Sequence, residues 1–190
     1  MAMKPIKGET ELIRRLKNPK LKNKAFKDLL DVHQERLYWY IRKIVLTHDN
    51  ANDVLQNTFI RVYKGIQDFK ENSALHTWMF RIAYNECIRF LEKNKIKSAF
   101  NQNDGNSDYL KNLTQDSYFD GEEIQLKLHA IISRLSKKQQ RVFQMKYFDD
   151  LSFHEISEIL DVSENTLKSS YYSAVKTIEK EIVCDTIQTN

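Results

Sequence analysis

The sequence has few of the residues that break helices or cross-link a chain. Only four of its 190 residues are Gly and two are Pro, and the Asp-Gly pairs lack the flanking alternating runs of a β-hairpin. Its two cysteines, Cys87 and Cys184, lie far apart in sequence, which argues against a small disulfide framework and fits a reducing compartment. Because Leu, Lys, Glu, Gln and Ile are abundant, the composition favours an all-α protein.

Long hydrophobic runs are missing as well. No apolar stretch approaches the ~20 residues that span a bilayer, and the charged N-terminal residues are not followed by the apolar segment of a secretory signal. We therefore expect a cytoplasmic protein with no membrane insertion. Its hydrophobic content of 41% is nevertheless sufficient to build a core.

The chemistry-bearing residues form no catalytic or metal-binding motif in the sequence. The five histidines are scattered, and His154-Glu155 lacks the second histidine of the zincin spacing. The chain has no glycine-rich loop to hold a phosphate, and neither cysteine has a histidine nearby in sequence. The sequence therefore predicts that the protein is not an enzyme and needs no metal or cofactor.

Charge is distributed unevenly along the chain. Residues 1–95 hold 19 Lys and Arg against 11 Asp and Glu, whereas residues 122–190 hold 9 against 11. The basic N-terminal half indicates a polyanionic partner. The acidic C-terminal part, in contrast, is not expected to bind nucleic acid tightly by itself.

Apolar residues recur at helical spacing through the N-terminal half. We predict helices over residues 10–17, from Asn23 to Leu46, from 51 to Tyr63 with Gly65 at its end, and over 74–93. His33 lies on an apolar helix face, where a core histidine is expected rather than a ligand. In the last of these helices aromatic and basic residues interleave, so the rings either stack on unpaired bases or fill the core.

Helical periodicity is lost between residues 96 and 121, where Asn, Asp, Ser, Gln and Gly dominate. This composition predicts a linker over 96–121 that joins two small helical domains, over 8–95 and 122–184. The second domain should hold four short helices. The chain from Cys184 onward has no periodicity and is expected to be frayed.

The stretch from Leu151 to Glu181 is typical of a helix-turn-helix. Ser152 and Glu155 have the spacing of a capping box, as do Ser136 and Gln139 one helix earlier, and Ser163 is a good cap for the last helix. The inward positions of that helix are Leu167, Tyr171, Ala174 and Ile178. Its outer face has the small polar, basic and aromatic groups that enter a DNA major groove: Asn165, Thr166, Lys168, Ser169, Tyr172 and Lys176. An ordinary helical hairpin with a solvated face is the alternative.

Two sequence blocks resemble the sigma factors of bacterial RNA polymerase, in the small two-domain extracytoplasmic-function group. The first block is NDVLQNTFIRVYKGIQDF followed by HTWMFRIAYNECIRFLEK, and the second is LSKKQQRVFQMKYFDDLSFHEISEILDVSENTLKSSYYSAVKTIE. With the long helix before them, the blocks cover about residues 23–181. The resemblance is specific because two independent motifs occur in the right order across a linker of suitable length.

The resemblance implies three contact surfaces. The segment that grips the coiled coil of the polymerase's largest subunit matches Asp53, Gln56, Asn57 and Phe59. The base-capturing loop for the promoter's −10 element, with the helix beside the opened strand, matches Phe69, Lys70, Asn72, Ser73, Trp78, Arg81 and Asn85. The family's −35 recognition helix matches the last helix, whose outer face is described above. The chain departs from the family at Asn57, usually acidic there, and at Ser170 and Ser173, which are often basic.

The function implied is that of a sigma factor, which binds core RNA polymerase at the coiled coil and flap region and directs initiation at promoter DNA. Family members are often held inactive by an anti-sigma factor. Two alternatives stay open. One is a helix-turn-helix regulator that acts without polymerase, which leaves the first domain unexplained, and the other is a degenerate sigma-like protein-interaction module.

Overall fold

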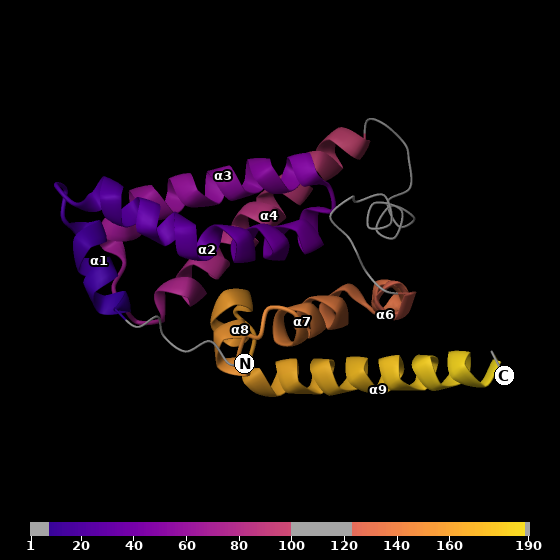
Figure 1. The fold of residues 1–190 in the computed structure, drawn as a ribbon. Helices are drawn as coiled ribbons and strands as arrows, with labels where there is room; N and C mark the ends of the chain where they lie inside the picture. The colour runs from indigo at the N-terminus through magenta and orange to yellow at the C-terminus, as the bar shows by residue number, and fades with distance from the viewer. Residues whose placement is uncertain (1–7, 100–122, 189–190) are drawn as a thin grey trace. The chain divides into compact units, whose positions relative to one another are not determined.

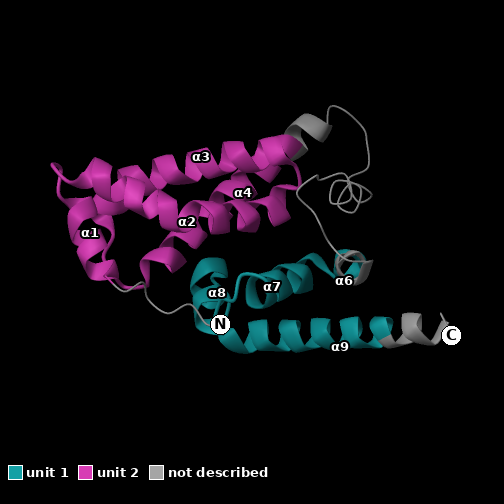
Figure 2. Cartoon of the chain, viewed as in Figure 1, with its two compact units in different colours: residues 1–2, 104–190 teal, residues 3–103 magenta. Residues whose placement is uncertain are grey.

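The computed structural model describes residues 8–99 and 123–188, and the regular structure within these ranges is entirely helical (Figure 1). The chain divides into two compact units, residues 3–103 and residues 104–190 with 1–2 (Figure 2). We call them the N-terminal unit and the C-terminal unit and describe each by itself. The predicted all-α class with two helical domains is confirmed.

The N-terminal unit is built on three helices that pack against one another. The elements are α1 (Glu9–Lys17), α2 (Lys22–Val45), α3 (His48–Gly65), the 3₁₀ turn η1 (Ile66–Asp68) and α4 (Leu75–Ala99). α2, α3 and α4 contact one another in pairs, and α1 lies against α2 and η1. Large side chains fill the space between them, among them Tyr40 and Phe80, whose ring centroids are 4.7 Å apart.

Two residues singled out from the sequence lie in this core. His33 on α2 is only 4% exposed, so the prediction of a core histidine is confirmed. Phe80 is fully buried, so this ring fills the core and is not available to stack on bases. Gly65 ends α3 as predicted, but its φ of −85° is right-handed and the chain continues directly into η1. The helix therefore ends by tightening rather than at a left-handed glycine.

The C-terminal unit consists of short helices followed by a long one. Its described elements are α6 (Glu123–Arg134), α7 (Lys137–Tyr147), α8 (Phe153–Leu160) and α9 (Glu164–Gln188). α6, α7 and α9 enclose a core formed by Ile131, Ile132, Leu135, Phe143, Ala174 and Ile178. The inward face predicted for α9 is confirmed, because Leu167, Ala174 and Ile178 are buried and Tyr171 is partly buried.

Both predicted capping boxes are present in the C-terminal unit. The hydroxyl of Ser136 accepts a hydrogen bond from the Gln139 amide at 3.4 Å, and that of Ser152 accepts one from the Glu155 amide at 3.2 Å. α8 ends at Leu160, and the capping residue Asp161, with a φ of 55°, turns the chain sharply into α9. These local interactions fix the helix-turn-helix geometry.

Two helices run further than the sequence pattern indicates. α4 continues to Ala99, so residues 96–99 of the predicted linker are helical, while the rest of that linker lies outside the described residues. The expectation that the chain frays from Cys184 is wrong as far as Gln188, where α9 ends. Extending an existing helix adds one hydrogen bond per residue fixed, and residues 184–188 contain neither Gly nor Pro to stop it.

Candidate functional site

The outer face of α3 carries an exposed polar row. Thr47 caps the helix by accepting a hydrogen bond from the Asn50 amide at 3.3 Å. Val54, Thr58 and Val62 are buried against the core, so the opposite side of the helix faces outward. There Asp53, Gln56 and Asn57 are exposed. Three of the four residues predicted to contact a protein partner therefore share one accessible face.

An apolar groove runs beside this polar row, between α2 and α3. It has a volume of about 440 Å³ and is lined by Phe26, Leu30, Gln34, Asn52, Leu55, Gln56, Phe59, Ile60, Tyr63 and Lys64. Phe59, the fourth predicted residue, is 9% exposed and lies edge-on to Phe26 at 6.2 Å. Ile60 is 44% exposed at the groove. An apolar floor with a polar rim is the usual anatomy of a protein-binding surface.

The second candidate surface combines the loop after η1 with one face of α4. Trp78, Arg81 and Asn85 are spaced three and four residues apart, so they share that face. Arg81 and Asn85 are exposed, and Trp78 is partly buried. The Trp78 ring lies 4.8 Å from the ring of Phe69 and also rests near Gly65. The indole thus joins the helix to the loop.

Within the loop, the structure separates a support from a polar tip. Phe69 is only 5% exposed, so its ring packs beneath the loop and does not offer a free stacking face. Lys70 and Asn72 are exposed and Ser73 is partly buried. The exposed side chains of the loop are therefore polar. Two side chains of α1 that the sequence did not single out, Glu9 and Lys17, bond to the ends of this loop.

The third candidate surface is the outer face of α9. Asn165, Ser169, Tyr172 and Lys176 recur at steps of four, three and four, and all are exposed, with Tyr172 at 63%. Thr166 and Lys168 are partly buried. The Thr166 amide and hydroxyl both bond to Ser163, which caps the helix as predicted. The six predicted residues are therefore brought together on one helix, and four of them are exposed.

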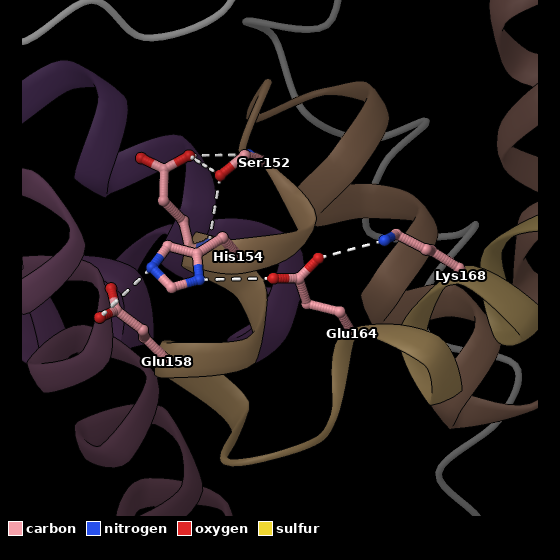
Figure 3. A network of polar contacts seen from close by, with 6 residues as sticks. Ser152, His154, Glu158, Glu164 and Lys168 are labelled. Carbon is pink, nitrogen blue, oxygen red and sulfur yellow. Dashed lines mark hydrogen bonds and ion pairs between the residues drawn. The ribbon is translucent and has the colours of Figure 1, made fainter.

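Lys168 is held by a polar network at the start of α9 (Figure 3). Its Nζ lies 3.2 Å from Glu164 Oε2, and Glu164 Oε1 lies 3.4 Å from His154 Nδ1. The hydrogen bond from Lys168 is the main reason that the pKa of Glu164 is lowered. Figure 3 also shows Glu158 beyond His154, at 3.9 Å from Nε2. Sequence reasoning missed Glu164, although its spacing of four residues from Lys168 is the signal of a helical ion pair.

The described part of the chain has no cluster of side chains that could bind a metal ion. Within residues 8–99 and 123–188, no three His, Cys, Asp or Glu side chains lie close enough to hold a metal ion. Over the same ranges no helix has the length and apolarity needed to span a membrane.

Comparison with known proteins connects these surfaces with one family. Residues 29–96 match the family model of sigma-70 region 2, and residues 125–178 match that of sigma-70 region 4. The chain is 27% identical over 166 residues to the ECF RNA polymerase sigma factor SigW of Bacillus subtilis, which covers 83% of this chain and 89% of the relative. It is also 27% identical over 169 residues to the ECF RNA polymerase sigma-E factor of Haemophilus influenzae, covering 84% and 88%.

Solved structures share the fold. The sigma factor RpoE from Bartonella quintana, in complex with the anti-sigma factor NepR, has a TM-score of 0.70 at 19% identity and covers 85% of this chain and 99% of its own. CnrH, in complex with the cytosolic domain of CnrY, has a TM-score of 0.66 at 16% identity, with coverages of 94% and 99%. The resemblance stated from the sequence is therefore confirmed at the level of family and fold.

Proposed function

The chain belongs to the sigma-70 family, in its extracytoplasmic-function group, as a sigma factor that directs transcription initiation, and from this premise we propose which of its surfaces meets each partner. The N-terminal domain, over residues 8–95, binds core polymerase and the −10 element. The C-terminal domain, over 122–184, binds the −35 element. Residues 96–121 connect them and run through polymerase toward the RNA exit path. The flap region of polymerase is a further proposed contact of the protein. The protein acts in the cytoplasm, where polymerase is.

The α3 surface is the proposed site for the coiled coil of the polymerase's largest subunit. A helical partner offers apolar side chains at intervals of three and four residues, and the groove beside Ile60 can accept them. Asp53, Gln56 and Asn57 lie next to the groove and supply hydrogen bonds at its rim. Phe59 is buried and forms part of the groove floor, so it contributes to the proposed contact by shaping the groove.

The loop and the α4 face are proposed to hold the opened −10 strand. Unpairing and unstacking a base costs a few kcal/mol, which a protein offsets by contacts to the extruded base and the backbone. Lys70, Asn72 and Ser73 are placed to bond to such a base, and Arg81 and Asn85 to follow the strand. Phe69 and Trp78 together form the support on which this loop rests.

The outer face of α9 is proposed to read the −35 element in the major groove. The N-terminal residues of a recognition helix contact base edges, which places Asn165, Lys168 and Ser169 nearest to them. Tyr172 and Lys176 follow along the helix. Serines stand at 170 and 173, and Lys168 is already paired with Glu164. This surface therefore binds promoter DNA weakly alone and depends on polymerase to hold it there.

The single observation that carries the proposal is the separation of the surfaces. One compact unit carries the groove and the loop, and the other carries a capped helix-turn-helix. A regulator acting without polymerase has no use for the first unit. We also propose an anti-sigma factor as a partner, since the structural neighbour RpoE was solved with the anti-sigma factor NepR bound.

Paired variants test the division of labour. Changing Asp53 and Gln56 together to Ala should lower the affinity for core polymerase at least tenfold, measured by fluorescence anisotropy. The circular dichroism spectrum should stay unchanged. Lys168→Ala should weaken promoter binding by the holoenzyme and reduce its salt slope by about 0.9, while polymerase affinity is unaffected. Equal loss of both affinities in the Lys168 variant would contradict the assignment.

The same experiment separates the two alternatives. Tight operator binding without polymerase, undiminished in the Asp53 and Gln56 variant, would support a polymerase-independent regulator. Stoichiometric polymerase binding with no promoter preference would support a degenerate interaction module, for which the missing basic residues at Ser170 and Ser173 are the motivating observation.

A further inference from the structure

We propose that α1 positions the loop of residues 69–74, with Lys17 as the positioning residue at its beginning and Glu9 at its end. The proposal rests on the proposed function, because the geometry of this loop matters only if it captures a −10 base. α1 precedes the segment that matches sigma-70 region 2, which begins at residue 29. Its role is thus a property of this chain's own contacts.

Lys17 is the last residue of α1 and reaches the first half of the loop. Its Nζ donates a hydrogen bond to the backbone oxygen of Phe69 at 2.8 Å and pairs with Glu71 Oε1 at 3.0 Å. The ammonium also lies 6.0 Å from the centroid of the Phe69 ring. One side chain therefore bonds to both the backbone and a side chain of the loop.

Glu9 is the first residue of α1 and holds the other end of the loop. Its Oε1 accepts a hydrogen bond from the backbone amide of Leu75 at 2.9 Å. Leu75 is the first residue of α4, where helix amides lack intrahelical partners. A carboxylate there satisfies one of these amides and complements the positive end of the helix dipole. α1 thus fixes the point at which the loop becomes helix.

α1 itself is firmly seated, so its bonds constrain the loop rather than follow it. Leu12, Ile13 and Leu16 are buried in the N-terminal unit. Arg15 forms an ion pair with Asp28 of α2 at 2.7 Å. A charged side chain attached to such a support restricts whatever it bonds to.

The loop needs such a restraint because part of its backbone is unfavourable by itself. Glu71 has a φ of 59°, in the left-handed region that non-glycine residues rarely adopt. It is exposed, and no burial fixes it. Without the bond from Lys17 the loop would sample other conformations, and base capture would then have to order it. Because α1 already holds the loop in this conformation, less ordering is needed when DNA binds.

The test uses holoenzyme assembled from this chain and core polymerase, on a promoter fragment that the wild-type holoenzyme opens, with 2-aminopurine in the −10 element. Lys17→Met keeps the apolar stem but removes the ammonium. It should slow opening at saturating holoenzyme by about tenfold, the size expected for one charge-assisted hydrogen bond, with polymerase affinity within twofold of wild type. Lys20→Met is the matched control, because Lys20 is an exposed lysine of the next turn. It should open the promoter at the wild-type rate.

A charge exchange separates positioning from simple attraction of DNA. Glu71→Lys adds positive charge to the loop, so attraction alone predicts faster opening, whereas our proposal predicts slower opening because Lys17 is repelled. Combining Glu71→Lys with Lys17→Glu restores the ion pair but leaves the Phe69 carbonyl oxygen without its donor, so it should recover only part of the lost rate. Faster opening by Glu71→Lys, or equal loss in Lys17→Met and Lys20→Met, would overturn the proposal.

Two controls keep the outcome interpretable. Thermal unfolding is recorded for each variant, and since Glu71 is exposed in the loop, the Glu71→Lys comparison stands even if a Lys17 variant is unstable. Failure of the wild-type holoenzyme to open any promoter would count against the proposed function. If the wild-type holoenzyme opens promoters and the variants open them at the same rate, the role of α1 is refuted and the proposed function stands.

Discussion

The burial of His33 makes the stability of the N-terminal unit depend on pH. The side chain is 4% exposed, and its Nε2 has no hydrogen-bond partner among the described residues. Burial lowers the pKa of His33 from 6.5 to about 4, and the nearby charges of His76 and Arg36 act in the same direction. The imidazole is therefore neutral in the folded protein at any pH near neutrality.

The sign and size of the effect follow from this pKa. In the unfolded chain His33 takes up a proton below about pH 6.5, but in the folded unit it resists protonation until about pH 4. Between these values the unfolded state binds more protons than the folded state. The contribution of His33 to stability is therefore fully present above pH 6.5 and is lost as the pH falls. At about 1.4 kcal/mol per pH unit, the unit should be about 2 kcal/mol less stable at pH 5 than at pH 8 through His33 alone.

The two tryptophans provide the assay. Trp39 and Trp78 both lie in the N-terminal unit, so their fluorescence reports the unfolding of that unit within the full chain. With an ordinary urea dependence for a domain of this size, the midpoint should fall by about 1–2 M from pH 8 to pH 5. His33→Gln cannot titrate and should remove most of this difference.

Because carboxylates also titrate at low pH, the quantity to compare is the difference in pH dependence between wild type and His33→Gln. An equal fall of the urea midpoint in both proteins would refute the reasoning from burial. So would a wild-type midpoint that is the same at pH 5 and pH 8.

Three further predictions concern the other surfaces. Ser152→Ala removes the capping box of α8 and should lower the free energy of unfolding of the C-terminal unit by about 1 kcal/mol, measured by circular dichroism in urea; no change would mean that the box is not stabilising. Glu164→Gln releases Lys168, so the holoenzyme should bind promoter more tightly and with a steeper dependence on salt; weaker binding would instead indicate a direct role of the carboxylate at a base. Ile60→Asp places a charge at the α3 groove and should lower polymerase affinity at least tenfold with the fold intact, and an unaltered affinity would place the coiled coil elsewhere.

Features set by neighbours in sequence were predictable, and those set by packing were not. The capping boxes of Ser136 and Ser152 and the inward face of α9 depend on residues within one or two turns, so the pattern identified them. The ends of α4 and α9 were placed too early, because a helix propagates through sequence that would not start one.

Long-range contacts account for the rest of the difference. The sequence gives no sign that Phe69 is buried under its own loop, because the ring that packs against it, Trp78, belongs to α4. Nor can it indicate that Lys17 bonds to Phe69, since 52 residues separate them. The pair of Glu164 and Lys168 was within reach of sequence reasoning, because its spacing is local.

Run-off transcription is the most direct test of the central claim. Purified core polymerase is supplied with a fragment library of the host genome, with and without this protein, and the new transcripts are mapped. We expect discrete start sites that share two upstream sequence elements and that disappear with the Asp53 and Gln56 double variant. Identical transcripts with and without the protein, from polymerase shown to bind it, would contradict its action as a sigma factor.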